Sequence, residues 1–229
     1  MSIAENIKTV KKQIAQAAQR NGRKAEDITL IAVTKTHPAA VVDEAIRCGI
    51  TDIGENRIQE AVEKYENVKK QAVWHLVGHL QRNKVKTALR IFDIIHSIDS
   101  LRLAVEINKR AAGTVDVFVE VNIGEEKSKS GIMPGETLSF LKELRVFPNL
   151  RCRGLMTIPP MIDDAEKLRH YFRDVAEIQA GANRMNIFDY PLTDLSMGMT
   201  DDYQIAIEEG ATMVRIGRAL FGERRNINQ

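Results

Sequence analysis

The chain has 229 residues, of which 44% are hydrophobic and 28% are charged, and its formal net charge is +2. This composition fills a hydrophobic core without creating a strong electric field, which argues against a nucleic-acid or membrane partner. No stretch reaches membrane-spanning length, and the lysines among residues 1–13 are atypical of a signal peptide, so we expect none. Cys48 and Cys152 fall in a predicted helix and a predicted strand, so we expect two reduced core thiols and a cytoplasmic protein.

The first predicted element is an amphipathic helix that precedes every strand. Ser2 and Glu5 have the spacing of a capping box, and apolar residues then recur at steps of four and three as far as Ala17. Asn21 and Gly22 are expected to end the helix. In a barrel this helix would be an extra element, packed on the outside or across the bottom.

The first predicted strand, residues 28–33, consists of apolar and β-branched residues and is typical of a buried parallel strand. Lys35 lies just beyond its carboxyl end, which is where an α/β barrel keeps its chemistry. Partial desolvation can keep a lysine amine uncharged there, so that it attacks an aldehyde and forms a Schiff base. The alternative is a solvated lysine that only ends the strand.

Strands and helices alternate through the rest of the chain. Further strands are expected at 51–54, 73–77, 91–95, 115–121, 150–156, 192–195 and 213–216. Helices are expected between them, with caps at Asp163 with Glu166 and at Thr200. About eight β/α units predict an α/β fold, a (β/α)8 TIM-type barrel with an extra N-terminal helix, as one domain over residues 1–229.

A doubly wound open sheet uses the same alternation and is the alternative architecture. Two features favour a closed barrel. The first strand is not followed by G-x-G-x-x-G, and polar or glycine residues come just after each strand, as expected if all these loops surround one mouth.

Two loops of the predicted barrel carry glycine where such folds often hold a phosphate, after the seventh and eighth strands. Ser196 can donate its hydroxyl, Gly198 lets the main chain approach closely, and Gly217 with Arg218 supplies main-chain N–H groups. The alternative for each glycine is a simple tight turn. Closure of the barrel would bring both loops beside Lys35.

An aldehyde-reactive lysine beside a phosphate site indicates pyridoxal 5'-phosphate (PLP) as the cofactor. A Schiff-base aldolase acting on a sugar phosphate would also need a reactive lysine and a phosphate site. The residues alone therefore leave both a PLP protein and an aldolase possible.

Seven segments, spread in order over nearly the whole chain, carry a family resemblance. They are IAVTK at 31–35, GENRIQE at 54–60, WHLVGHLQRNK at 74–84, SKSG at 128–131, RGLMTIPP at 153–160, LSMGMTDD at 195–202 and VRIGRALFG at 214–222. With them the sequence closely resembles the pyridoxal phosphate homeostasis protein family, single-domain relatives of the barrel of bacterial alanine racemase. The resemblance implies a fold-type III PLP barrel.

The resemblance also implies how the cofactor would be held. Lys35 would hold PLP as a Schiff base. Ser196, with the main chain of Gly198, Gly217 and Arg218, would bind its phosphate.

The resemblance also implies that two further residues lie near the ring of the cofactor. Arg215 would reach the pyridine nitrogen, where its permanent charge opposes protonation and weakens the ring as an electron sink. Asn56 would lie near the ring or its 3'-oxygen. The alternative for Arg215 is an ion pair with Glu120 or Asp194 inside the barrel.

Other ionisable residues have simpler interpretations. His75 and His96 are expected to be core or rim histidines, and no H-x-H or Cys-His cluster indicates a metal. Lys127 and Lys129 are expected to be solvated loop charges, with attraction of an anionic phosphate as the alternative. His79 stands where some relatives have proline, which argues against a ring contact.

Racemisation or transamination needs a second acid/base group opposite the lysine. In alanine racemase this group is a tyrosine from a separate β domain, and we expect no such domain here. The tyrosines of this chain, Tyr65, Tyr171, Tyr190 and Tyr203, fall in predicted helices or a loop. The sequence therefore favours a binding protein that carries and buffers PLP over an efficient enzyme.

The expected partners are PLP and the PLP-dependent apoenzymes that receive it, and the expected state is a monomer or a weak homodimer. Three alternatives stay open. They are a weak PLP-dependent amino-acid racemase or decarboxylase, a Schiff-base aldolase, and a regulatory protein for which the cofactor is a signal.

Overall fold

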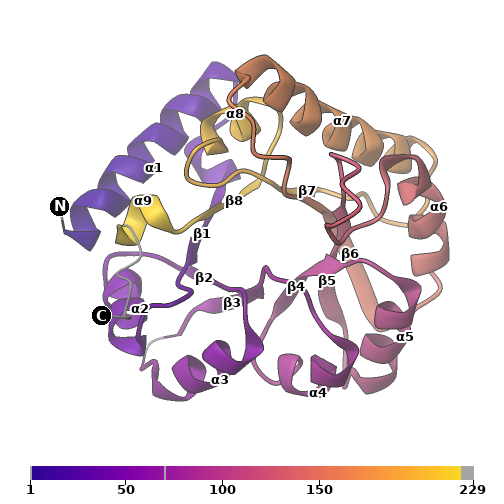
Figure 1. Ribbon diagram of the computed structural model, residues 1–229, viewed down its shortest axis with the longest axis horizontal. Helices are drawn as coiled ribbons and strands as arrows, with labels where there is room; N and C mark the ends of the chain where they lie inside the picture. Colours follow the sequence, from indigo (N-terminus) through magenta and orange to yellow (C-terminus); the bar gives the residue numbers. More distant parts are fainter. Residues whose placement is uncertain (1, 70, 223–229) are drawn as a thin grey trace.

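The computed structural model describes residues 2–69 and 71–222, and its strands form a closed parallel barrel in chain order (Figure 1). The strands are β1 (Thr29–Val33), β2 (Asp52–Glu55), β3 (Val73–Leu76), β4 (Ile94–Ile98), β5 (Val115–Val121), β6 (Leu150–Thr157), β7 (Asp194–Ser196) and β8 (Met213–Ile216). β8 pairs with β1 and closes the barrel, with Ile31 opposite Arg215. The predicted eight-stranded barrel is confirmed, and the open sheet is excluded.

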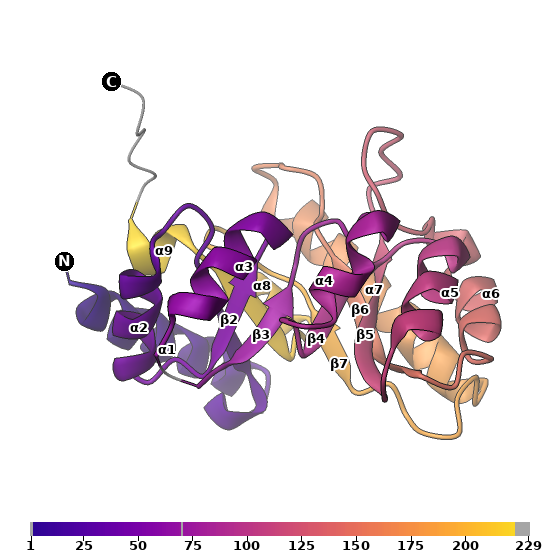
Figure 2. The same ribbon diagram turned by 90° about the horizontal axis from the view of Figure 1, so that it is seen from below.

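Helices surround the strands on the outside (Figures 1 and 2). They are α1 (Ile3–Arg20), α2 (Ala39–Arg47), α3 (Ile58–Asn67), α4 (Val85–Ala88), α5 (Leu101–Arg110), α6 (Pro134–Leu144), α7 (Ala165–Arg184), α8 (Tyr203–Glu208) and α9 (Arg218–Phe221). Short 3-10 helices cover Ala25–Asp27 and Arg82–Lys84. Among residues 2–69 and 71–222, no helix is both long enough and apolar enough to cross a membrane.

The extra helix α1 begins with the predicted capping box. The Ser2 hydroxyl accepts the Glu5 N–H at 3.3 Å, and the Glu5 carboxylate accepts the Ser2 N–H at 2.7 Å. Its buried face, which includes Ile7, Val10 and Ile14, packs on α8 and α9 on the outside of the barrel (Figure 1). The helix therefore supports the elements that follow β7 and β8.

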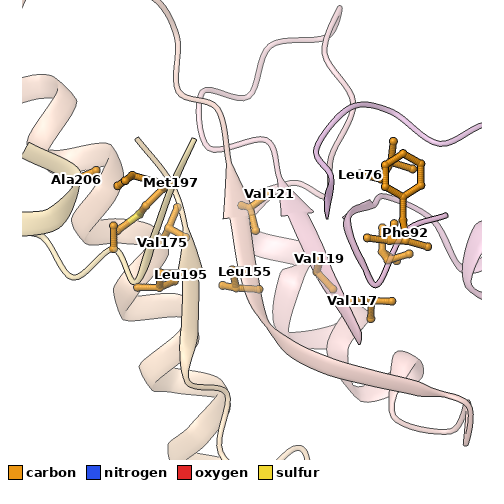
Figure 3. Packing of buried hydrophobic residues seen from close by; sticks show 14 of the residues in the cluster. Leu76, Phe92, Val117, Val119, Val121, Leu155, Val175, Leu195, Met197 and Ala206 are labelled. Carbon is orange, nitrogen blue, oxygen red and sulfur yellow. The ribbon is translucent and has the colours of Figure 1, made fainter. Parts of the chain in front are cut away.

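Side chains along each strand alternate between the helices and the inside of the barrel. Val117, Val119 and Val121 lie at every second position of β5 and belong to the large outer core (Figure 3). A separate buried cluster takes one residue from each of five strands and fills the inside: Ile31, Ile94, Phe118, Met156 and Met213. His96 and Arg215 follow Ile94 and Met213 by two positions, and so they also face the inside.

The fourth strand begins later than predicted, at Ile94 instead of residue 91. The main-chain N–H groups of Ile91 and Phe92 both donate to the Ala88 carbonyl, at 3.0 and 2.9 Å, so these residues complete the turn after α4. Their apolar side chains enter the core from that turn. His96 therefore lies inside the strand and not at its end.

Two helix caps also differ from the prediction. The cap of α7 is Asp164, not Asp163, because the Asp164 carboxylate accepts the first free N–H groups of the helix. α8 begins at Tyr203, and Thr200 does not cap it, because the Thr200 hydroxyl accepts the Ala219 N–H at 3.3 Å instead.

Candidate functional site

Lys35 lies two residues beyond the end of β1, at the carboxyl-terminal mouth of the barrel, and is partly buried. It belongs to a turn in which the His37 N–H donates to the Thr34 carbonyl at 3.0 Å. Thr36, the next residue, has a φ of 68°, in the left-handed region that β-branched residues rarely adopt. The turn that carries the lysine is therefore held in an unfavourable backbone conformation.

A buried ion pair supports this turn from one side. Lys64 Nζ donates to Glu55 Oε1 at 2.6 Å and to the Thr34 carbonyl at 2.7 Å, and the Thr34 hydroxyl donates to the same Glu55 oxygen at 2.5 Å. The Glu55 side chain is 0% exposed and the Lys64 side chain 8% exposed. Burial raises the pKa of Glu55, although the charge of Lys64 opposes the rise.

A second carboxylate holds the other side of the turn. Glu60 accepts the Thr36 N–H at 2.9 Å and lies 3.6 Å from Lys64 Nζ. We call Thr34, Glu55, Glu60 and Lys64 the turn clamp. Lys64 and Glu60 bond to the main chain on the two sides of Lys35, and Glu55 bonds to Lys64 and to the Thr34 hydroxyl. Sequence reasoning missed the clamp, although the i,i+4 spacing of Glu60 and Lys64 on a predicted helix was a usable signal.

Arg215 reaches into the barrel from β8 and is 4% exposed. Its guanidinium donates to the Ser196 carbonyl at 2.5 Å, to the Ser196 hydroxyl at 2.8 Å and to the Thr157 carbonyl at 2.8 Å. Burial lowers the pKa of Arg215 to about 10, and the more distant charges of Asp202 and Glu120 oppose this. The guanidinium therefore stays charged at neutral pH.

The alternative ion pair of Arg215 with Glu120 or Asp194 is not formed. Asp194 pairs with Arg153 at 2.9 Å, and Glu120 accepts the Ser130 hydroxyl at 3.0 Å. Within the described part of the chain, Arg215 forms no ion pair with any carboxylate. A buried cation without such a partner fits a site that receives an electron-rich ligand.

Two buried histidines connect Ser196 to the other end of the barrel. His96 Nδ1 lies 2.9 Å from the Ser196 hydroxyl, and its Nε2 lies 2.9 Å from His75 Nδ1. His75 Nε2 lies 2.9 Å from Asp52 Oδ1, at the start of β2. The interpretation of His75 and His96 as core residues is confirmed, since both are buried and hydrogen-bonded. Burial lowers the pKa of His96 well below its usual value.

The glycines predicted to approach a phosphate have close contacts within the protein. Gly198 has a φ of 94°, and a Cβ atom there would lie 2.7 Å from Ala206 Cβ in α8. A Cβ atom on Gly217 would lie 3.2 Å from the Val33 carbonyl, at the end of β1. The loop after β8 thus packs close to the end of β1, whereas the loop after β7 packs against α8 (Figure 1).

Arg218 is the first residue of α9. Its guanidinium pairs with Asp201, in the loop before α8, and is half-exposed. The predicted contribution of Arg218 came from its main-chain N–H, which stays a prediction.

The remaining predicted residues lie around the mouth. Asn56 follows β2, and its carbonyl lies so close to Gly78 that a Cβ atom on the glycine would clash with it. His79 is half-exposed and lies 3.1 Å from the Asp99 carboxylate, which gives it a partner other than a ligand. Lys127 and Lys129 are both exposed, as predicted, and Lys129 also pairs with Glu126 at 2.6 Å and donates to the Pro159 carbonyl at 3.4 Å.

The mouth carries groups of the kinds that PLP would require. They are the Lys35 amine, the buried Arg215 cation and the main-chain N–H groups of the loops after β7 and β8. Two cavities of about 830 and 880 Å³ lie at the opposite end of the barrel and border none of these residues. Over residues 2–69 and 71–222, no group of three His, Cys, Asp or Glu residues could hold a metal ion.

Comparison with known proteins agrees with this geometry. A model of the alanine racemase N-terminal domain family matches residues 2–225. A curated relative from Aquifex aeolicus, named pyridoxal phosphate homeostasis protein, is 42% identical over 229 residues, which are 98% of this chain and 100% of the relative.

Two solved structures extend the comparison. PipY of Synechococcus elongatus, solved with PLP bound, superposes with a TM-score of 0.81 at 33% identity, over 96% of this chain and 100% of PipY. An alanine racemase from Clostridium difficile superposes with a TM-score of 0.74 at 17% identity, over 99% of this chain and 58% of that enzyme, which supports the fold alone.

Proposed function

Because the chain belongs to the pyridoxal phosphate homeostasis protein family, we propose that it binds PLP and carries and buffers it inside the cell. The observation that carries this proposal is Arg215, a buried cation without an ion-pair partner among the described residues, on the strand that pairs with the Lys35 strand. A relative that matches over its full length is named a homeostasis protein, and PipY was solved with PLP bound.

We assign the parts of the cofactor to residues of the mouth. Lys35 Nζ holds PLP covalently as a Schiff base, and Asn56 lies on the ring side of the site. Bound PLP supplies a reactive aldehyde and an electron-withdrawing ring. Arg215 faces the ring nitrogen with a permanent charge and opposes its protonation.

The phosphate side of the site is formed by Ser196, Gly198, Gly217 and Arg218. Main-chain N–H groups in such loops bind anions without a charged side chain. The packing of Gly217 against Val33 supports this assignment, because it keeps the loop after β8 next to the turn of Lys35.

We propose that the protein turns over no amino acid efficiently. The Tyr203 hydroxyl donates to Gln13 on α1, and the Tyr190 hydroxyl accepts the Cys152 N–H, so both phenols are occupied outside the barrel. Tyr65 packs against Trp74, and Tyr171 lies on α7. A single cytoplasmic barrel domain, monomeric or weakly dimeric, that hands PLP to apoenzymes stays the predicted form.

A transfer assay tests this function. The purified protein is loaded with PLP, freed of excess cofactor and mixed with the apo-form of a PLP-dependent aminotransferase. We expect aminotransferase activity to return up to the amount of PLP loaded, and the Lys35→Ala variant, treated identically, to restore little.

The same loaded protein is incubated with L- and D-amino acids. Racemisation or decarboxylation that exceeds the rate with free PLP and disappears in Lys35→Ala would contradict the carrier and establish a weak enzyme. Failure of the wild type to retain any PLP would overturn both functions.

A further inference from the structure

A continuous chain of hydrogen bonds crosses the inside of the barrel from Arg215 to Asp52. It joins Arg215, Ser196, His96, His75 and Asp52 through successive contacts of 2.8, 2.9, 2.9 and 2.9 Å. Ser196, His96 and His75 are each 0% exposed. The chain runs from the last residue of β7 to the first residue of β2, so it links the mouth with the opposite end of the barrel.

The two ends of the chain fix the direction of its hydrogen bonds. Arg215 can only donate, so the Ser196 hydroxyl oxygen accepts from it. Burial works to raise the pKa of Asp52, but hydrogen bonds from His75 and Thr51 outweigh burial and lower it, so Asp52 is an ionised acceptor. Donors therefore point from Arg215 toward Asp52.

One neutral arrangement satisfies every contact in between. The Ser196 hydroxyl donates to His96 Nδ1, His96 Nε2–H donates to His75 Nδ1, and His75 Nε2–H donates to Asp52. The reverse direction requires a second proton on His75.

The positive charges that face His96 disfavour a second proton on its ring. Arg215 approaches from β8 and Arg153 from β6, whereas Asp52 on β2 is the carboxylate in contact. Arg153 itself pairs with Asp194 and Asp116. An imidazolium inside the barrel would add a third positive charge to the two arginines.

We propose that Asp52, His75, His96 and Ser196 are positioning residues that hold Arg215 for bound PLP through hydrogen bonds of a single direction. This inference rests on the proposed function. It also refines the role of Ser196. The Ser196 hydroxyl proton is committed to His96, so Ser196 serves the cofactor by orienting Arg215, and main-chain N–H groups donate to the phosphate.

The first test needs no cofactor. Long-range 1H–15N spectra of protein labelled in histidine report which ring nitrogen carries the proton. We expect His75 and His96 each to carry a proton on Nε2, and His96 to stay neutral below pH 6.5, because its pKa is lowered. A proton on Nδ1 of either ring would overturn the proposal.

The second test measures the effect on the cofactor. His96→Phe keeps a flat ring on Phe118, against which His96 stacks at 4.4 Å, but breaks the chain. Asp52→Asn, a change of similar shape at the far end, removes the charged acceptor. In both PLP-loaded variants Arg215 is less firmly held and opposes protonation of the ring nitrogen less. We therefore expect the apparent pKa of the ring nitrogen, read from the pH-dependent absorbance, to rise by about one unit, a tenfold change in proton affinity.

The controls separate the possible failures. His79→Phe lies at the rim and outside the chain of hydrogen bonds, so we expect it to leave the absorbance titration unchanged. His96→Gln offers a donor and an acceptor, so we expect its titration to lie between those of His96→Phe and the wild type. Unchanged titrations in both His96→Phe and Asp52→Asn would contradict the proposal. A wild type that binds no PLP would contradict the proposed function, while the tautomers would still decide the direction of the chain.

Discussion

The turn that carries Lys35 is strained at Thr36, whose φ of 68° places a β-branched residue in the left-handed region. Strain of this kind costs about 1–3 kcal/mol and persists only where surrounding contacts impose it. The turn clamp supplies those contacts, because Glu60 accepts the Thr36 N–H and Lys64 donates to the Thr34 carbonyl. At the scale of single residues, the position of Lys35 depends on the buried ion pair of Glu55 and Lys64, which are distant from it in the sequence.

Lys64→Met tests the clamp. The variant leaves the Glu55 carboxylate buried without its cation, and Glu55 Oε2 already has no hydrogen-bond partner in the described residues. We expect a loss of about 3 kcal/mol in the free energy of unfolding, measured by urea denaturation.

Two further variants show whether the loss of stability comes from the buried Glu55 charge. Glu55→Gln added to Lys64→Met should recover part of the loss, because the stranded charge is removed. Lys8→Met, at an exposed position of α1, is the matched control and should change stability by less than about 0.5 kcal/mol. An equal effect of Lys64→Met and Lys8→Met on the free energy of unfolding would show that the turn clamp does not stabilise the protein.

Sequence reasoning could have found only the Glu60 and Lys64 part of the clamp, for a physical reason. Whether Glu55 and Lys64 are solvated or buried depends on how β2 and α3 pack against the Lys35 turn. Spacing alone gives the Glu60 and Lys64 pair on α3, and most such pairs are exposed and weak.

Among the elements, the loop between β7 and α8 depends most on one residue. Gly198 combines a φ of 94° with main chain that passes close to Ala206 and Tyr203. Its carbonyl accepts the Arg215 N–H at 3.0 Å, so the loop is tied to β8 at the position of the buried arginine. The glycine is needed for this contact as well as for any approach of a ligand.

Gly198→Ala should therefore destabilise the protein by about 2 kcal/mol, through the left-handed backbone and the clash with α8. We also expect weaker retention of PLP, because α8 must move. Gly113→Ala, where a Cβ atom meets nothing within 4 Å, is the control and should be nearly neutral. Equal thermal midpoints for the two variants would show that the contact of Gly198 with α8 is unimportant.

Sequence patterns predicted the ends of strands and helices well where the apolar pattern alone sets them, and less well where tertiary contacts set them. β5 has the predicted bounds, because apolar residues alternate along its length, and β8, which is apolar except for Arg215, also has them. β4 and α8 begin later than predicted, because Phe92 completes the turn after α4 and Thr200 bonds to α9. Such contacts join residues that local patterns treat separately.

For the whole molecule, barrel closure brings the functional residues together. Counting eight strands predicts that β8 lies beside β1, and hence that Arg215 and Gly217 approach the Lys35 strand. The chain from Arg215 to Asp52 could not be predicted in this way. It joins His96 to Ser196, which are 100 positions apart, and such a contact depends on the register of strands on opposite sides of the barrel.

The covalent attachment of PLP to Lys35 can be tested directly. The PLP-loaded protein is reduced with borohydride, digested, and mapped by mass spectrometry, with Lys35→Ala treated in parallel. We expect a reduced pyridoxyl adduct on Lys35 and none in the variant. An adduct on another lysine such as Lys129, or a protein that retains no PLP before reduction, would contradict it.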